Sequence, residues 1–283
     1  MDNRPIGFFD SGLGGLTCIP HLLRGFPRER VVYFGDTART PYGSKAPSTI
    51  LKFAMEIADF LIESQNIKLL AIACNTVSAT ALEELRKRHP GVPVLGIIKP
   101  AARAVAAGCP ASGRIGVIGT KATISSGAYE DEIAESAPEL KVFGRACPAL
   151  VPLIEEGIIQ NKIMDLAIEY YLGSFLKTNA LDTLILGCTH YPLIRANIER
   201  LYPGLSIIDP SVEFAPAIGE ALERIDGGGD SGDESGHIIY ASDLSENFVN
   251  MIDNIFTGTG LPVTLELIDL ESFPKRKEAR NGT

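Results

Sequence analysis

A weak internal repeat constrains the fold of this chain more than any other feature of its sequence. Segment 6–9 resembles segment 115–118, and segment 31–35 resembles segment 140–144, each at an offset of 109 residues. Segment 69–76 resembles segment 183–190 at an offset of 114. Three matches in one order indicate a duplicated structural unit. The alternative is that any protein of alternating strands and helices yields similar segments by chance.

The repeated segments are short, apolar and separated by amphipathic stretches. Strands that are apolar on both faces are typical of parallel sheets covered by helices. We expect strands at 6–9, 31–35, 69–73, 94–97, 115–119, 141–143, 183–187, 206–208 and 238–240. We expect helices at 50–61, 78–89, 162–177, 213–225 and 244–256, with right-handed crossovers between the strands.

These patterns predict an α/β fold of two pseudo-symmetric lobes, each with a mainly parallel sheet flanked by helices, and an active site in the cleft between them. The first lobe would comprise residues 1–98 plus 210–283, and the second residues 99–209. The segment after residue 209 is expected to return to the first lobe. Its acidic, glycine-rich stretch 226–236 is predicted to be a mobile, solvated loop.

The net charge and the cysteines exclude several classes of partner and fold. The net charge of −9 argues against nucleic-acid and anionic-membrane partners, because both bind surfaces with clustered Lys and Arg. The five cysteines form no CxxC motif and are odd in number, so a disulfide framework is not expected.

The N-terminus lacks the long apolar stretch of a signal peptide, and no apolar run approaches the roughly 20 residues of a membrane helix. We therefore predict a cytoplasmic protein with reduced thiols.

Cys74 and Cys188 occupy the same place in the two repeat copies. Each ends an apolar strand and precedes polar residues and a helix, and ligands bind beyond the carboxyl ends of such strands. The N-terminus of the following helix favours a thiolate. A lone buried cysteine is usually a packing residue, as we expect for Cys18, Cys109 and Cys147. The matched pair predicts instead two thiols that face one ligand.

Two opposed thiols suit the inversion of a carbon stereocentre. One thiolate removes the proton from one face of the carbon, the opposed thiol delivers a proton to the other face, and the two exchange roles in the reverse direction. Charge that develops on the substrate must also be stabilised.

Polar residues near the same sheet edge are candidates for assisting roles. Asp10 could bind a substrate ammonium or manage a thiol proton, although a turn or cap role is the alternative. His190 lies two residues from Cys188 and could assist that thiol, or it could be structural. Ser11 and its repeat counterpart Thr120 could donate hydrogen bonds to a carboxylate.

Two further segments are less specific. The loop Pro41-Tyr42-Gly43 offers backbone N–H groups to an anion, with a plain turn as the alternative. Glu155 and Glu156 form an acidic pair, and such pairs are usually solvated surface charge.

At these residues the chain resembles the glutamate racemases of the cofactor-independent aspartate/glutamate racemase superfamily. The resembling stretches appear in family order and cover most of the chain. They are 9–16, 33–36 with 41–43, 73–76, 151–157 and 186–193, of which the Gly-Cys-Thr-His-Tyr-Pro run at 187–192 is the most distinctive.

The resemblance implies a two-lobed racemase that interconverts L- and D-glutamate without cofactor or metal and supplies D-glutamate for bacterial peptidoglycan. Cys74 and Cys188 match the catalytic cysteines, on the D-glutamate and L-glutamate faces respectively. Asp10 and His190 match the groups that assist them, and Glu155, preferred over Glu156, matches a supporting carboxylate. The positions that match substrate-binding residues are Ser11, Tyr42, Gly43, Asn75, Thr76, Thr120 and Thr189, with Pro41 beside them.

Alternatives remain at this point. Gly12, Gly14 and Gly15 form part of a dinucleotide-binding motif, but Thr17 stands where its third glycine belongs. A pyridoxal phosphate racemase would need a Schiff-base lysine, for which Lys99 and Lys121 are candidates.

Three other readings also stay open. Cys74, Cys188 and His190 could bind zinc, the substrate could be another acidic amino acid such as aspartate, or the chain could be a two-lobed binding protein without activity. The sequence does not set the oligomeric state, and a homodimer is compatible with it.

Overall fold

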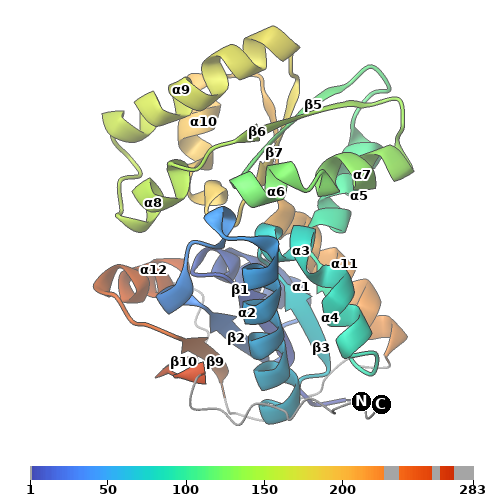
Figure 1. Ribbon diagram of the computed structural model, residues 1–283, viewed down its shortest axis with the longest axis vertical. Helices are drawn as coiled ribbons and strands as arrows, with labels where there is room; N and C mark the ends of the chain where they lie inside the picture. Colours follow the sequence, from blue (N-terminus) through green and yellow to red (C-terminus); the bar gives the residue numbers. More distant parts are fainter. Residues whose placement is uncertain (1, 226–235, 257–261, 271–283) are drawn as a thin grey trace.

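Two parallel sheets organise the chain, one in each lobe (Figure 1). The computed structural model describes residues 2–225, 236–256 and 262–270. Within these residues the first sheet has six strands in the order β10-β9-β2-β1-β3-β4, and the second has four in the order β6-β5-β7-β8. The strands are β1 (Ile6–Asp10), β2 (Val31–Gly35), β3 (Leu69–Ile72), β4 (Val94–Gly96), β5 (Arg114–Gly119), β6 (Lys141–Ala146), β7 (Thr183–Gly187), β8 (Ser206–Ile208), β9 (His237–Ala241) and β10 (Val263–Leu267).

The strand order repeats between the lobes. The run β2-β1-β3-β4 of the first sheet has the same order as β6-β5-β7-β8 of the second. β1 pairs in parallel with β2 and β3, as β5 does with β6 and β7. The three repeated sequence segments therefore lie at equivalent places in the two sheets, which confirms the predicted repeat and the α/β fold.

The chain beyond residue 209 contributes strands to the first sheet. β9 pairs with β2, and β10, which we did not predict, pairs with β9. The lobe boundaries at residues 98/99 and 209/210 stay a prediction. The predicted mobile loop at 226–236 falls almost entirely on residues 226–235, which lie outside the described residues.

Helices cover both sheets (Figure 1). They are α1 (Cys18–Gly25), α2 (Pro47–Asp59), α3 (Asn75–Thr80), α4 (Leu82–Arg88), α5 (Ile98–Gly108), α6 (Lys121–Ser125), α7 (Ala128–Ser136), α8 (Leu150–Glu155), α9 (Lys162–Asn179), α10 (Arg195–Leu201), α11 (Pro210–Arg224) and α12 (Glu246–Phe256). Short 3-10 turns lie at Gly14–Thr17, Thr37–Arg39, Tyr42–Ser44 and Tyr191–Ile194, and a π turn at Phe60–Ser64. In the described part of the chain, no helix is both long and apolar enough to span a bilayer.

The continuous helix expected at 78–89 is wrong, because the chain breaks between α3 and α4. Ala81 has φ −128° and ψ −7°, outside the helical region. At the preceding residue, the Thr80 hydroxyl donates to the Thr76 carbonyl one turn back, over 2.7 Å. A threonine hydroxyl that bonds back to the preceding turn disturbs a helix at that point. The short α3 keeps its N-terminus at the sheet edge beside Cys74.

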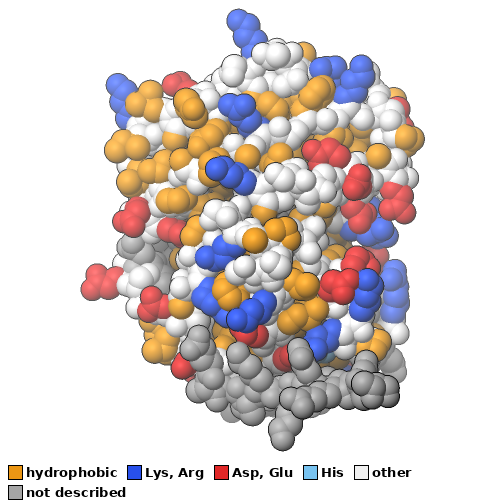
Figure 2. Space-filling model, in the orientation of Figure 1, with side chains coloured by type: hydrophobic (Ala, Val, Ile, Leu, Met, Phe, Trp, Pro, Cys, Tyr) orange, Lys and Arg blue, Asp and Glu red, His pale blue; other side chains and the backbone are white. Residues whose placement is uncertain are grey.

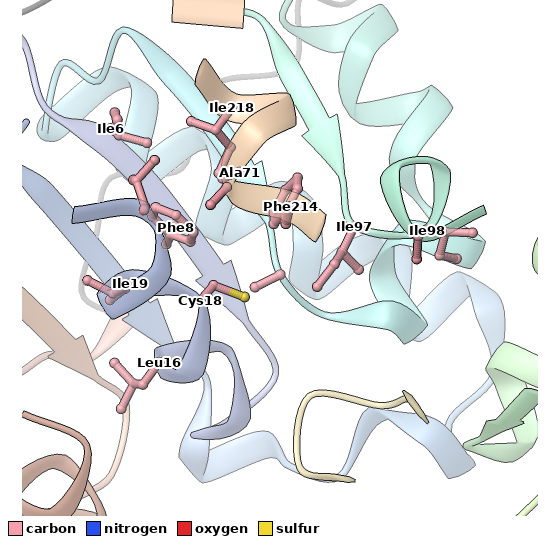
Figure 3. Packing of buried hydrophobic residues seen from close by; sticks show 14 of the residues in the cluster. Ile6, Phe8, Leu16, Cys18, Ile19, Ala71, Ile97, Ile98, Phe214 and Ile218 are labelled. Atoms are coloured by element: carbon pink, nitrogen blue, oxygen red, sulfur yellow. The ribbon is translucent and has the colours of Figure 1, made fainter. Parts of the chain in front are cut away.

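One apolar core contains residues of both lobes. Figure 3 shows the part of this core in which Phe8, Ile98 and Phe214 lie. Phe8 of β1 contacts Phe214 of α11 edge-on, with ring centroids 6.4 Å apart. The same cluster contains Ile98 of α5 and Ile185 of the second sheet. α5 and α11 thus pack between the lobes, and their shared burial fixes how the two sheet edges face each other. Separate clusters fill the outer face of each sheet, under α2 in the first lobe and under α8 and α9 in the second.

Candidate active site

The structure brings Cys74 and Cys188 to one cavity between the lobes. Cys74 precedes α3 just beyond β3, and Cys188 immediately follows β7. About 310 Å³ of space free of atoms lies between its walls, part of it open to solvent. Its lining comprises Ser11, Thr40, Pro41, Tyr42, Gly43, Cys74, Asn75, Thr76, Thr120, Val151, Cys188, Thr189 and His190.

The lining contains every predicted substrate-binding residue except Asp10, and both predicted cysteines. It adds Thr40 and Val151, which the sequence reasoning missed because neither has a repeat counterpart or a distinctive chemistry. Asp10 and Glu155 lie behind the lining and contact it.

Cys74 is held as a neutral thiol. Its Sγ donates to the Ser11 hydroxyl over 3.3 Å, and only 3% of the residue is exposed. Burial, followed by the nearby Asp10 carboxylate, raises the pKa of Cys74 from its ordinary 9.0 to about 12, although the hydrogen bond to Ser11 opposes the rise. At neutral pH this sulfur carries a proton that it can donate.

His190 lies between Cys188 and the carboxylate of Glu155. The Nδ1 atom of His190 lies 3.8 Å from Cys188 Sγ, and its Nε2 lies 3.1 Å from Glu155 Oε1. Burial lowers the pKa of His190, but the hydrogen bonds to Cys188 and Glu155 outweigh burial and raise that pKa from 6.5 to about 10. The imidazole is therefore protonated at neutral pH. A positive charge beside a sulfur stabilises a thiolate.

Asp10 is a buried carboxylate that a glycine-rich turn surrounds. Its Oδ2 accepts backbone N–H bonds from Gly12 at 3.3 Å and Gly15 at 3.0 Å. Across the cleft, the Thr189 hydroxyl donates to Asp10 Oδ1 over 3.4 Å. The turn that partly matches a dinucleotide motif thus has its N–H groups directed at the protein's own carboxylate rather than at a phosphate.

Hydroxyl groups from both lobes meet at the cavity wall where α3 lies against α6 (Figure 1). Thr76 Oγ1 lies 3.0 Å from Thr120 Oγ1 and 3.3 Å from Thr123 Oγ1. Thr120 also caps α6 by accepting the Thr123 N–H. Sequence reasoning missed Thr123, whose role is visible only once the lobes are packed together.

The loop that carries Tyr42 and Gly43 is anchored by a buried carboxylate. Asp36 accepts a short hydrogen bond from the Tyr42 hydroxyl, and another from Ser242 over 2.8 Å. Arg39 Nε also donates to Asp36, over 2.7 Å. Gly43 lies so close to the second lobe that a Cβ atom there would come within 2.3 Å of Thr120 Cβ. The loop is thus held from the first lobe and presses on the second.

The two lysines that a pyridoxal phosphate racemase could use lie away from the cavity. Lys99 is ion-paired with Glu132 at 3.3 Å, and Lys121 lines an outer groove, so neither lysine faces the cavity. In the residues described, no cluster of three or more His, Cys, Asp or Glu side chains is arranged to hold a metal ion.

The arrangement can move a proton across a bound molecule. The first lobe contributes a protonated thiol at Cys74 to the cavity lining, and the second lobe contributes Cys188 beside an imidazolium. Hydroxyl, amide and backbone N–H groups between them can bind the carboxylates of an anionic ligand.

Comparison with known proteins agrees with this chemistry. Residues 16–215 match the family described as Asp/Glu/Hydantoin racemase. The glutamate racemase of Geobacter metallireducens is 43% identical over 263 residues, which are 91% of this chain and 94% of that protein.

Solved structures also match along nearly the whole chain. Glutamate racemase from Francisella tularensis in complex with D-glutamate superposes with a TM-score of 0.87 at 36% identity, covering 96% of this chain and 100% of that one. Escherichia coli glutamate racemase in complex with L-glutamate and the activator UDP-MurNAc-ala gives a TM-score of 0.75 at 26% identity, covering 93% and 98%. The chain belongs to the Asp/Glu/hydantoin racemase family, alongside its glutamate racemases.

Proposed function

We propose that this protein interconverts L- and D-glutamate by moving one proton off, and another onto, the α-carbon with Cys74 and Cys188. The observation that carries the proposal is the placement of both sulfurs in one cavity, at equivalent positions of two repeated sheets. Two such groups on opposite faces of a stereocentre can invert it, since one removes the proton and the other delivers one.

The two sulfurs act as base and acid in turn. Cys188, next to the His190 imidazolium, acts as the thiolate base that removes the α-proton of L-glutamate, and the electron pair passes into the α-carboxylate. Cys74 then donates its proton to the opposite face, which gives D-glutamate, a Cys188 thiol and a Cys74 thiolate. In the reverse direction Cys74 is the base and Cys188 the acid, and Asp10 and His190 assist them respectively.

Glutamate binding follows from the donors in the lining. The Thr76 and Thr120 hydroxyls and the amide of Asn75 offer hydrogen bonds to two carboxylates. Relatives from Francisella tularensis and Escherichia coli are described with D-glutamate and L-glutamate bound, and we infer the same ligands here.

Incubation of the purified protein with L-glutamate in heavy water tests the reaction. Optical rotation should decay, and the D-glutamate formed should carry deuterium at the α-carbon. A parallel incubation with L-aspartate tests the alternative acidic substrate. Inversion of L-glutamate that introduced no solvent deuterium into the product would overturn the two-base route.

The proposal extends to location, product use and assembly. A cytoplasmic location keeps the two thiols reduced, as the reaction requires. Its product, D-glutamate, would serve bacterial peptidoglycan synthesis. We infer a homodimer, and light scattering should then give twice the 30.3 kDa of one chain. A mass of 30.3 kDa at working concentration would contradict the dimer.

The described surface offers apolar side chains for such an assembly. Ile163, Leu166 and Tyr170 of α9 are 56%, 55% and 74% exposed, and orange side chains gather over this helix in Figure 2. Tyr170→Glu would place a charge on this face. A dimer that contacts through α9 should then lose mass in light scattering, and an unchanged mass would place the contact elsewhere.

A further inference from the structure

The structure assigns Tyr129 as a positioning residue that aims the amide of Asn75 at the substrate carboxylate and ties together the two cysteine-bearing segments. This inference rests on the proposed function and concerns a residue that does not itself line the cavity. Tyr129 is the second residue of α7 and is 1% exposed. Gly127, in the left-handed region with φ +70°, makes the turn from α6 that directs Tyr129 inward.

Tyr129 reaches from the second lobe to the first. Its hydroxyl donates to Asn75 Oδ1 over 2.6 Å, and Asn75 is the residue after Cys74. Its ring lies against Gly187, the residue before Cys188, because a Cβ atom on Gly187 would come within 3.2 Å of Tyr129 Cε2. One side chain therefore contacts both segments from which the cysteines project.

The hydrogen bond also decides which end of the amide remains for a ligand. A neutral tyrosine hydroxyl that donates to Oδ1 leaves the amide nitrogen free to donate elsewhere. Asn75 Nδ2 is buried without a hydrogen-bond partner, and Asn75 lines the cavity. A buried donor without a partner is costly unless a ligand satisfies it. A substrate carboxylate is the acceptor that fits a donor facing this cavity.

Burial keeps Tyr129 in the donating state. It raises the pKa of the hydroxyl well above 10, and the nearby Cys188 and Asp209 charges act in the same direction. The hydroxyl thus keeps its proton for Asn75 throughout the range in which the enzyme is measured. Without it, the amide could rotate and present Oδ1, an acceptor, to the carboxylate.

Tyr129→Phe tests the assignment, with Tyr240→Phe as a matched control. The Tyr240 hydroxyl also donates to a side-chain amide, Gln65 Oε1, over 3.3 Å, but remote from the cavity. We expect Tyr129→Phe to raise KM for glutamate roughly tenfold with a smaller change in kcat, and Tyr240→Phe to change neither. An unchanged KM in Tyr129→Phe would overturn the inference while leaving the two-cysteine reaction intact.

A double-mutant cycle separates positioning from general destabilisation. If Tyr129 acts through Asn75, then Tyr129→Phe should add nothing to KM in an Asn75→Ala background, whereas independent roles would multiply. If Tyr129→Phe raises KM by the same factor with Asn75 present and with Asn75→Ala, the inference is overturned.

A measurement on the Tyr129-containing protein covers the case in which Tyr129→Phe does not fold. In a Cys74→Ser variant, which should bind glutamate without turnover, the side-chain amide signal of Asn75 should shift on titration with D-glutamate. The signal is assigned by its loss in Asn75→Ala. A signal that stays in place while other signals report binding would overturn the inference.

Discussion

The Nε2 atom of His190 lies 3.1 Å from Oε1 of Glu155, and this contact joins the cavity to a carboxylate behind its wall. His190 is 2% exposed, whereas a quarter of the Glu155 side chain, 24%, reaches solvent. The carboxylate thus stabilises the imidazolium from the solvent side while Cys188 faces it from the cavity.

Replacement of Glu155 should therefore reduce activity through His190. We expect Glu155→Gln to lower kcat/KM by roughly tenfold, because an amide no longer stabilises the imidazolium. Glu156→Gln is the matched control, since Glu156 is exposed and its neighbour makes the contact. Steady-state kinetics of both variants are the measurement. Equal losses in the two would contradict the assignment of Glu155 over Glu156.

The raised pKa of His190 predicts how stability depends on pH. The folded value of about 10 exceeds the ordinary 6.5, so this group's contribution is complete below pH 6.5 and is lost as the pH rises toward 10. It amounts to at most about 5 kcal/mol. Denaturant unfolding should show that the advantage of the parent protein over His190→Asn shrinks between pH 6.5 and 10. An advantage that grew with pH would refute the charged imidazole.

The opposed thiols predict different defects in the two cysteine variants. Cys74→Ser and Cys188→Ser should each lose roughly 10²–10⁴-fold in racemisation. Residual α-proton exchange with heavy water should be confined to L-glutamate in Cys74→Ser, where Cys188 remains, and to D-glutamate in Cys188→Ser. Proton NMR of the two enantiomers measures both rates. Exchange of the same enantiomer by both variants would mean that the sulfurs share one face.

Contact between the lobes at Gly43 should be sensitive to a single methyl group. In Gly43→Ala the new Cβ would lie 2.3 Å from Thr120 Cβ, which forces the loop or the lobe to move. We expect kcat/KM to fall roughly 10–100-fold, because small misplacements of reacting groups are costly. Gly108→Ala, where no heavy atom lies within 4 Å, should retain parent kinetics. Parent kinetics in Gly43→Ala would show that the loop need not press on Thr120.

A buried ion pair supports the first lobe far from the cavity. Lys68 Nζ lies 2.7 Å from Glu29 Oε2, with side-chain exposures of 0% and 4%. Lys68→Met should destabilise the fold by up to about 3–5 kcal/mol, because it removes a cation from beside a buried carboxylate. Urea unfolding measures the loss, and Lys87→Met in the exposed pair with Glu84 should leave the midpoint unchanged. A small effect at Lys68 would mean that Glu29 finds other partners.

The sequence predicted those parts of the molecule that depend on local pattern. Continuous apolar runs located nine strands, and the repeat placed Cys74 and Cys188 at equivalent strand ends. Glu155 could be chosen over Glu156 only by resemblance, since both have the same chemistry and only the packing of α8 brings one of them to His190.

The sequence did not predict contacts that arise only when distant segments pack together. Tyr129 stands in an ordinary amphipathic stretch, and its link to Asn75 crosses 54 residues and two lobes. The break at Ala81 lies beside a hydroxyl contact that sequence periodicity does not reveal, and β10 is an edge strand whose pairing with β9 comes from tertiary structure.

The late arrival of β9 affects how the chain matures during synthesis. The strands β5–β8 form an uninterrupted insertion between β4 and β9. The ribosome therefore synthesises the whole second sheet before Ser242, the residue after β9, can donate its hydrogen bond to Asp36. Until then β2 has an open edge, which invites pairing with neighbouring nascent chains. Truncated translation products that end before β9 should therefore aggregate, and competence for turnover should appear only after β9 has been synthesised.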